Sequence, residues 1–222
     1  MKSEKEFIHA QTVVSTASLV PEIKLQLATE VTPLWQMTEE RLKQNGLPPP
    51  YWAFAWPGGQ GMSRYILDNP EIVRDKRVLD FAAGCGIAAI AAMKVGAKSA
   101  VIAEIDPMAF AATDINAAHN QVRVDAIDNL DMTKPPKNID LIIAGDVCYQ
   151  QAMSAKLMRW LWVCTAKGIR VLIADPGRAY VPHEGLEKRS EYAVPTSRDL
   201  EDRDSRDVII WELKPELLKA LE

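Results

Sequence analysis

The hydrophobic pattern changes near residue 77, where short apolar runs begin to alternate with longer, alanine-rich stretches. The short runs predict strands at residues 77–81, 99–104, 122–127, 139–144 and 168–174. The stretches between them predict helices at residues 86–94, 107–119 and 150–165. Strands that alternate with helices in this way indicate a Rossmann-like, doubly wound α/β fold with a mostly parallel sheet.

The last part of the chain breaks this alternation. Residues 192–194 and 208–211 have the composition of strands, but a charged run at residues 197–207 joins them instead of a helix. We therefore expect a terminal hairpin whose two strands bring the five strands above to a seven-stranded sheet and place an antiparallel strand in it. The charged run is expected to be a solvated loop of that hairpin.

The segment ahead of the α/β pattern has a different character. Residues 1–46 read as helical, with one helix running from Pro33 to a stop at Gly46. Residues 47–61 are too rich in proline and glycine for a regular element, yet they carry several aromatic side chains, so a packed loop is expected. We divide the chain into a helical segment with this aromatic loop, residues 1–70, and an α/β domain, residues 71–222.

The overall charge narrows the classes of partner. The sequence holds 26 Lys and Arg against 30 Asp and Glu, a formal net charge of −4. A nucleic-acid-binding surface usually carries a basic excess, so nucleic acid is not an expected partner. No apolar stretch approaches the length of a membrane span, and the charged first residues do not resemble a secretory signal. We expect a cytoplasmic protein without a membrane partner.

Cysteine and histidine positions bear on disulfides and metals. Cys85, Cys148 and Cys164 form no Cys-x-x-Cys pair, and the histidines lack the spacing of metal ligands. Neither a disulfide framework nor a metal site is therefore expected, and a reducing compartment suits the cysteines.

A glycine turn directly after the strand at residues 77–81 carries the first chemical signal. Gly84-x-Gly86-x-x-Ala89 lets the backbone approach a ligand and fits the dinucleotide fingerprint, with Glu104 at the distance of a ribose-binding acid. Two enzyme classes share that pattern. Asp80 separates them, because a carboxylate beside the turn repels a pyrophosphate but attracts the ammonium group of an amino-acid-like cofactor. S-adenosylmethionine carries that ammonium group, a sulfonium cation and no phosphate.

Several motifs together resemble one family. Asp80 to Gly86 is similar to motif I of class I S-adenosylmethionine-dependent methyltransferases, and Ala103 to Pro107 is similar to their second-strand motif. Asp146-x-x-Tyr149 matches the signature of the family 16 protein methyltransferases, and Trp56-Pro57-x-Gly59 resembles their tryptophan loop. Asp175 to Arg178 further resembles the group of lysine methyltransferases that act on the beta subunit of electron transfer flavoprotein. We expect a form of this group without a transit peptide.

The resemblance implies a protein-lysine methyltransferase domain over residues 71–222, with S-adenosylmethionine as cofactor and electron transfer flavoprotein beta subunit as protein partner. A residue of the loop after the third strand is expected to accept a hydrogen bond from the adenine amino group. Asp131 is a further candidate for this acceptor. The expected cofactor-binding residues are Trp56, Asp80, Gly84, Gly86, Glu104, Asp128 and Asn129. The expected catalytic residues are Asp146 and Tyr149.

Asp146 has a role that elementary acid–base chemistry constrains. Lysine titrates near pH ~10.4, so on the order of one in a thousand side chains is the neutral nucleophile at neutral pH. A neighbouring carboxylate favours the charged form, which opposes attack. Asp146 is therefore expected to bind and orient the amine rather than to remove its proton. The alternative is that Asp146 and Tyr149 only begin the helix at Gln150.

Other functions remain open at this point. The chain is also similar to ribosomal protein L11 methyltransferases over motif I and the second strand, although Asp146 stands where those enzymes usually have an Asn-rich motif. A nicotinamide-dependent oxidoreductase would share the glycine turn, but Asp80 and the terminal hairpin disfavour it. A non-catalytic cofactor-binding module is the third alternative, and the intact Asp146-x-x-Tyr149 disfavours it.

Overall fold

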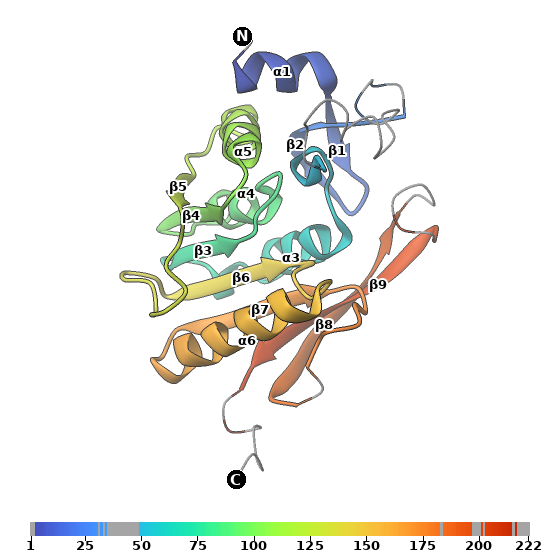
Figure 1. Ribbon diagram of the computed structural model, residues 1–222. Coiled ribbons are helices and arrows are strands. Elements are labelled where there is room, and N and C mark those ends of the chain that lie inside the picture. Colours follow the sequence, from blue (N-terminus) through green and yellow to red (C-terminus); the bar gives the residue numbers. More distant parts are fainter. Residues whose placement is uncertain are drawn as a thin grey trace.

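The computed structural model describes residues 3–30, 32, 34, 49–182, 184–196, 201, 203–214 and 216. A two-stranded sheet and a seven-stranded sheet organise them (Figure 1). The predicted helix between Pro33 and Gly46 lies almost entirely outside the described residues.

The seven-stranded sheet has the order β5-β4-β3-β6-β7-β9-β8. The five strands β5, β4, β3, β6 and β7 are mutually parallel. Strand β9 runs antiparallel to both β7 and β8. Their bounds are β3 Arg77–Phe81, β4 Ser99–Glu104, β5 Asp125–Asp128, β6 Leu141–Gly145, β7 Arg170–Asp175, β8 Leu186–Pro195 and β9 Ser205–Leu213. The predicted mostly parallel sheet with a terminal antiparallel hairpin is confirmed.

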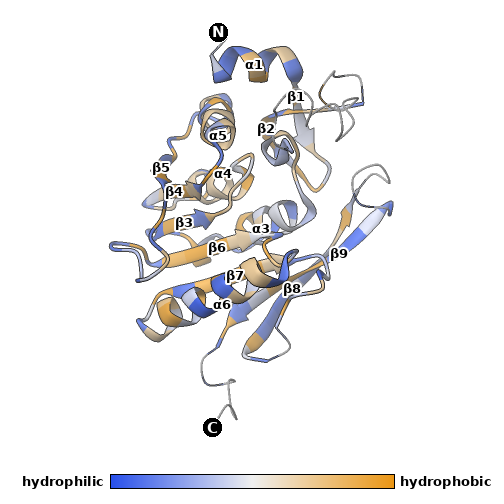
Figure 2. Ribbon diagram, viewed as in Figure 1, coloured by the Kyte–Doolittle hydropathy of each residue, from blue (hydrophilic) through white to orange (hydrophobic). Residues whose placement is uncertain are grey.

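Alternating side chains send the central strands' apolar positions to two separate cores. On β6, Leu141 and Ile143 face one core, whereas Ile142 and Ala144 face the other. The first core lies under α3 (Pro57–Asp68) and α4 (Ile87–Lys94), and the second lies under α6 (Gln151–Ala166). Both faces of β6 are therefore buried. In Figure 2 this strand has the hydrophobic colour, whereas much of the edge strand β8 is hydrophilic.

The helix termini near the sheet follow their sequence signals. Asp106 caps α5 (Pro107–His119) by accepting a hydrogen bond from the Met108 amide, and Pro107 takes the first helical position. The predicted strand at 122–127 is shorter than expected. Val122 and Val124 pack against the core from a loop, so β5 begins only at Asp125.

The N-terminal segment corrects the helical prediction. A helix, α1 (Glu4–Gln11), is present, but residues 13–27 form an antiparallel hairpin of β1 (Val13–Ala17) and β2 (Val20–Leu27). The reason lies in a period of two along β2, where Ile23 and Leu25 are buried and Lys24 between them is exposed.

The aromatic segment is also more regular than predicted. It contains a short 3₁₀ turn, η1 (Tyr51–Ala53), and the start of α3 at Pro57. Proline is tolerated at the first position of a helix, and here the glycines that follow allow a close approach to β6. Helix α3 packs on α4 and on the sheet. Along the chain it is followed by η2 (Pro70–Ile72). The domain boundary at residue 70 stays a prediction.

No helix of the described residues combines the length and the apolar character that crossing a membrane requires.

Two adjacent glycines of α3 provide a matched pair of tests. A Cβ at Gly58 would lie 2.6 Å from the Asp146 nitrogen and 2.7 Å from the Ala174 oxygen, whereas one at Gly59 would meet only an Ile87 methyl at 3.3 Å. We expect Gly58→Ala to reduce the free energy of unfolding by about 1–3 kcal/mol, because the clash is with backbone. Gly59→Ala is the control, and equal urea midpoints for the two variants would contradict the close approach.

Candidate active site

The carboxyl ends of the parallel strands carry a row of acidic side chains. Asp80 lies near the end of β3, Glu104 ends β4, and Asp128 ends β5 directly opposite Glu104 in the register. Asp146 follows β6, and Asp175 ends β7. In open α/β sheets this edge is where ligands bind, so the sequence motifs meet at the expected place.

The glycine turn between β3 and α4 forms the floor of the site. Gly84 and Gly86 have positive φ angles of 55° and 75°, a backbone conformation that residues with a side chain rarely adopt. A Cβ at Gly86 would lie 2.6 Å from Thr113, so the turn packs tightly against α5 there. At Gly84 the atom nearest to such a Cβ is the main-chain oxygen of Tyr51, at 3.7 Å. The Gly84 side of the turn is therefore open beneath η1.

Asp80 and Glu104 lie next to the turn and hold its amides. The Asp80 carboxylate accepts a hydrogen bond from the Ala89 amide at 3.0 Å, and Glu104 accepts one from the Gly84 amide at 2.7 Å. Asp80 is 3% exposed, and this burial raises the pKa of its carboxyl to about 7, although the Ala89 amide opposes the shift. Burial also raises the pKa of Glu104.

These two carboxyl groups lack a basic partner, because no ion pair with either is found in the part of the chain that the structure describes. A bound cation would therefore stabilise both ionised forms. These two acceptors fit the ammonium group and the ribose hydroxyls of S-adenosylmethionine, which donate hydrogen bonds, and they would repel a pyrophosphate.

The loop after β5 holds the adenine candidates. The Asn129 side-chain amide donates to Asp128 Oδ1 at 2.9 Å, and Asn129 has a φ of 52°. Asp131 accepts from the Thr133 amide and pairs with Lys134, interactions that hold the pKa of its carboxyl below the usual range. Asp128 and Asn129 are thus beside Glu104, while Asp131 is engaged within its own turn.

An aromatic cluster joins the turn to the start of α3. The Trp56 indole N–H donates to the Tyr51 oxygen at 2.9 Å, and the two rings pack edge to face with centroids 5.9 Å apart. Tyr51 also lies 6.4 Å from the ring of Tyr149. Tyr149 is 46% exposed, so its ring forms an accessible wall close to Glu104.

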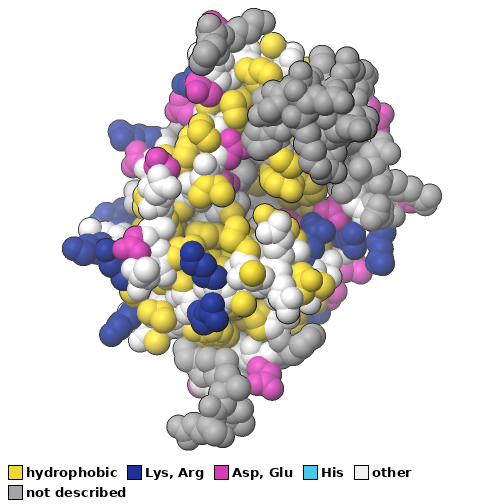
Figure 3. Space-filling model, viewed as in Figure 1, with side chains coloured by type: hydrophobic (Ala, Val, Ile, Leu, Met, Phe, Trp, Pro, Cys, Tyr) yellow, Lys and Arg dark blue, Asp and Glu magenta, His cyan; other side chains and the backbone are white. Residues whose placement is uncertain are grey.

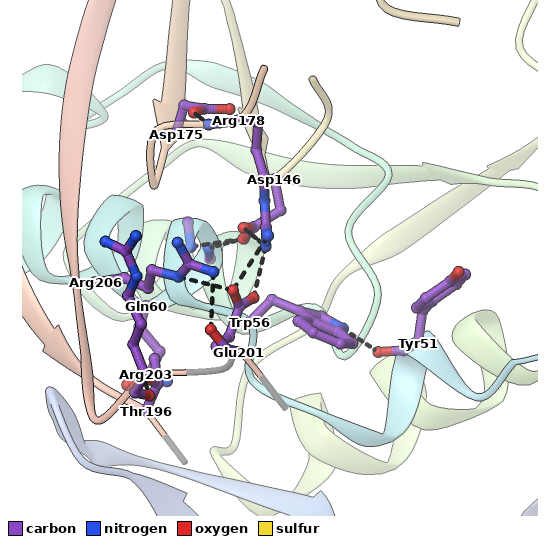
Figure 4. A network of polar contacts seen from close by, with 12 residues as sticks. Tyr51, Trp56, Gln60, Asp146, Asp175, Arg178, Thr196, Glu201, Arg203 and Arg206 are labelled. Atoms are coloured by element: carbon purple, nitrogen blue, oxygen red, sulfur yellow. Dashed lines mark hydrogen bonds and ion pairs between the residues drawn. The ribbon is translucent and has the colours of Figure 1, made fainter. Parts of the chain in front are cut away.

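Asp146 binds the N-terminus of a helix that is distant in the sequence. Its Oδ2 accepts hydrogen bonds from the Gly58 amide at 2.6 Å and the Gly59 amide at 3.3 Å, at the first turn of α3. Its Oδ1 pairs with Arg178 at 3.0 Å (Figure 4). Burial raises the pKa of this carboxyl to about 6, and the charge of Arg178 opposes the shift.

The alternative role for Asp146, as the start of the following helix, is wrong. Gln150 is the N-cap of α6, and no side chain caps that helix. Asp146 itself has a φ of 56°, a conformation that costs energy for a residue other than glycine and that is often found at functional sites.

Two residues at the site had no predicted role. Arg178, in the turn after β7, reaches both Asp146 and Glu201. Glu201 belongs to the charged run that was expected to be solvated, but it is buried, so that expectation is wrong at this position. The Asp175-Pro-Gly-Arg178 motif pointed to Arg178, whereas nothing in the sequence distinguished Glu201 from its charged neighbours.

The sequence comparisons support the chemistry of this edge. The profile of the ribosomal protein L11 methyltransferase (PrmA) family matches residues 62–147. The electron transfer flavoprotein beta subunit lysine methyltransferase of Rattus norvegicus is 38% identical over 210 residues, which cover 91% of this chain and 81% of that protein. The Homo sapiens protein of the same name is 38% identical over 223 residues, covering 95% and 82%.

The chain belongs to the electron transfer flavoprotein beta subunit lysine methyltransferase family. This methyltransferase is accordingly an enzyme that transfers methyl groups from S-adenosylmethionine to lysine side chains of protein.

Solved structures agree with the fold. A Thermoplasma acidophilum protein superposes with a TM-score of 0.53 at 16% identity, covering 70% of this chain and 89% of that one. A candidate RNA methyltransferase from Pyrococcus horikoshii gives 0.52 at 15% identity, covering 75% and 89%. These likenesses establish the Rossmann-like architecture of this methyltransferase.

The raised pKa of Asp80 predicts a pH dependence of cofactor binding. Below about 7 the carboxyl is protonated in the free enzyme, so a cationic ligand must displace a proton. We expect the affinity for S-adenosylhomocysteine, which keeps the ammonium group, to rise with pH between about 6 and 8, by at most about tenfold per unit.

Isothermal titration calorimetry measures this affinity and the protons released. Asp80→Asn should bind more weakly and without the pH dependence, while Asp125→Asn, at an exposed position in β5, is the matched control. An unchanged slope in Asp80→Asn would show that Asp80 is not the titrating group.

Proposed function

We propose that this methyltransferase methylates a lysine of the beta subunit of electron transfer flavoprotein. The observation that carries the proposal is Asp146 at the carboxyl end of β6, with only 12% of its side chain exposed, held by α3 and Arg178 beside the accessible ring of Tyr149. The relatives that share most of the chain carry that substrate in their names.

The cofactor would lie over the glycine turn. Asp80 would hold its ammonium group, and Glu104 would accept hydrogen bonds from its ribose hydroxyls. The backbone of Gly84 and Gly86 would border the methionine part, although in this structure the Gly84 amide donates to Glu104 and the Gly86 amide to the Ala83 main-chain oxygen. Asp128 or Asn129 would meet the adenine. S-adenosylmethionine supplies an electrophilic methyl carbon attached to its sulfonium.

Trp56 is expected to contribute its ring face rather than its N–H group. The indole N–H already donates to the Tyr51 oxygen. The ring packs against both Tyr51 and Phe54, so it would close the site from the side of α3.

The geometry of Asp146 suits an orienting role. A carboxylate has about four acceptor positions, and the amides of Gly58 and Gly59 with the Arg178 guanidinium use three of them. One position on Oδ1 is left for the lysine amine. A carboxylate held this firmly fixes the amine in line with the methyl carbon, and this positioning is the main demand of a displacement reaction.

The lysine must lose a proton before it attacks, and Asp146 is not the group proposed to take that proton. The carboxylate favours the ammonium form, but the cationic Arg178 beside it favours the neutral amine. Proton loss to water would then precede attack. Tyr149, with its ring exposed, would pack against the methylene stem and the cationic head of the lysine.

A protein partner agrees with the character of the surface. Lys and Arg side chains on the face shown in Figure 3 are mixed with acidic and apolar ones, and the net charge is −4. A phosphate-binding surface concentrates basic side chains, so nucleic acid and membrane are not the proposed partners. A cytoplasmic location stays part of the proposal.

Ribosomal protein L11 is the second candidate substrate. The family profile for its methyltransferase matches residues 62–147, and the Alteromonas mediterranea enzyme of that name is 39% identical over 101 residues, 44% of this chain and 32% of that protein. The profile match ends at residue 147, before Arg178 and Glu201; Arg178 contacts Asp146 directly, and Glu201 contacts it through Arg178.

Labelling of purified proteins distinguishes the two candidate substrates. Incubation with methyl-labelled S-adenosylmethionine should label electron transfer flavoprotein beta subunit, with the modified lysine identified by mass spectrometry. Label on L11 alone would refute the proposed substrate while keeping the reaction. Absence of label on either protein and on a cell extract would contradict protein methylation itself.

Asp146→Asn tests the orienting role. The amide oxygen can still accept from Gly58 and Gly59, so the helix terminus is kept, but the negative charge beside the amine is lost. We expect kcat on the protein substrate to fall about 100-fold, as misplacement of a reacting group does. Affinity for S-adenosylhomocysteine should be unchanged, and Asp125→Asn, at an exposed position in β5, is the control. Near-normal turnover in Asp146→Asn would make the orienting role wrong.

A further inference from the structure

Resting on the proposed role of Asp146, we propose that Glu201 and Arg178 are positioning residues of the active site. Glu201, brought in by the β8–β9 hairpin, fixes the Arg178 guanidinium, and the guanidinium fixes the Asp146 carboxylate with one acceptor position open to the lysine. The hairpin is thereby a part of the catalytic structure.

Arg178 has the geometry of a bridge. Its Nη2 atom lies 3.0 Å from Asp146 Oδ1 and 2.6 Å from Glu201 Oε1, and its Nη1 atom lies 3.1 Å from Glu201 Oε2 (Figure 4). The two contacts to Glu201 are bidentate, which fixes the plane of the guanidinium. A single nitrogen then presents a proton to Asp146 in a defined direction.

The backbone of Arg178 is fixed as well. The Asp175 carboxylate accepts from the Arg178 amide at 2.6 Å, closing the turn after β7. The main chain of Arg178 is thus held from the end of β7, and its side chain from the connection between β8 and β9. The guanidinium cannot turn away from Asp146 without breaking the Glu201 pair.

Glu201 is built into the site rather than adjacent to it. Its side chain is 3% exposed, which is rare for a glutamate unless it is paired. Arg206 on β9 donates from Nε to Glu201 Oε2 at 3.0 Å and from Nη2 to the Glu201 main-chain oxygen at 2.8 Å. These bonds anchor Glu201 to the sheet and leave its carboxylate directed at Arg178.

The charge of the cluster supports a cationic substrate. Asp146, Asp175 and Glu201 carry three negative charges when ionised, against two positive charges on Arg178 and Arg206. The cluster therefore has a net charge of −1 at the point where the amine would bind. A lysine ammonium would balance it before giving up its proton.

Three charged groups influence the titration of Asp146: Arg178 lowers its pKa, and Asp175 and Glu201 raise it. If Glu201 acted only through its own charge, its removal would lower the pKa of Asp146. If Glu201 holds Arg178 in place, its removal lets the guanidinium withdraw, and the pKa of Asp146 rises. The two roles thus predict opposite shifts.

The experiment is the pH profile of kcat for Glu201→Gln on the protein substrate, beside Arg178→Gln and the double variant. We expect Glu201→Gln to lower kcat about tenfold to 100-fold and to move the acid limb to higher pH. Arg178→Gln should move it the same way. The double variant should match Arg178→Gln alone, because Glu201 acts through Arg178.

Several results would overturn the proposal. An acid limb that moves to lower pH or stays in place would show that Glu201 acts by its charge alone or not at all, and additive losses in the double variant would show that the two residues act separately. Glu191→Gln, at an exposed position on β8, is the matched control and should behave as the parent enzyme.

A folding defect is separated from a positioning defect by a second variant. Affinity for S-adenosylhomocysteine and the thermal unfolding midpoint report the integrity of each protein. Should Glu201→Gln fail to fold, Glu201→Asp keeps the charge but shortens the reach, so positioning still predicts the upward shift and a charge effect predicts none. If the parent enzyme labels no protein substrate, the proposed function fails. If the parent is active and the variants show its pH profile, only the positioning role of Glu201 and Arg178 fails.

Discussion

The contact between the N-terminus of α3 and the carboxyl end of β6 is the constraint on which the site depends. The Asp146 carboxylate caps a helix that begins at Pro57, so residues far apart in the sequence share one hydrogen-bonded corner. A side chain is excluded on α3 at Gly58 and also on β6 at Gly145, where a Cβ would lie 2.8 Å from the Gly59 nitrogen. This approach sets where Trp56 stands relative to the glycine turn and where Arg178 can reach.

The sheet could be predicted because its signals are local. Buried parallel strands are short apolar runs, and caps such as Asp106 with Pro107 mark the helices between them. The β1–β2 hairpin was mistaken for a helix because only one of its strands shows a clear period of two. The start of α3 was missed for another reason: glycines there disfavour a helix locally and are explained only by the backbone they approach.

The same distinction separates the predicted and the unpredicted parts of the site. Asp80 and Glu104 end apolar strands, so their position at the ligand edge follows from the pattern. Glu201 lies in a run of alternating charges, and its burial depends on Arg178 and Arg206, which other strands bring to it. A buried ion pair of this kind is a property of the completed fold and leaves no local pattern.

The capping of α3 by Asp146 also bears on how such an enzyme could lose its activity during evolution. A drifting gene copy usually discards catalytic side chains first, because their loss leaves the scaffold intact. Here the carboxylate that orients the amine also satisfies two amides of a buried helix terminus, so discarding it weakens the scaffold at the same time. Catalytic and structural selection therefore act on one side chain, and an inactive descendant keeps a stable start of α3 only where the replacement, as asparagine would, still accepts from both amides.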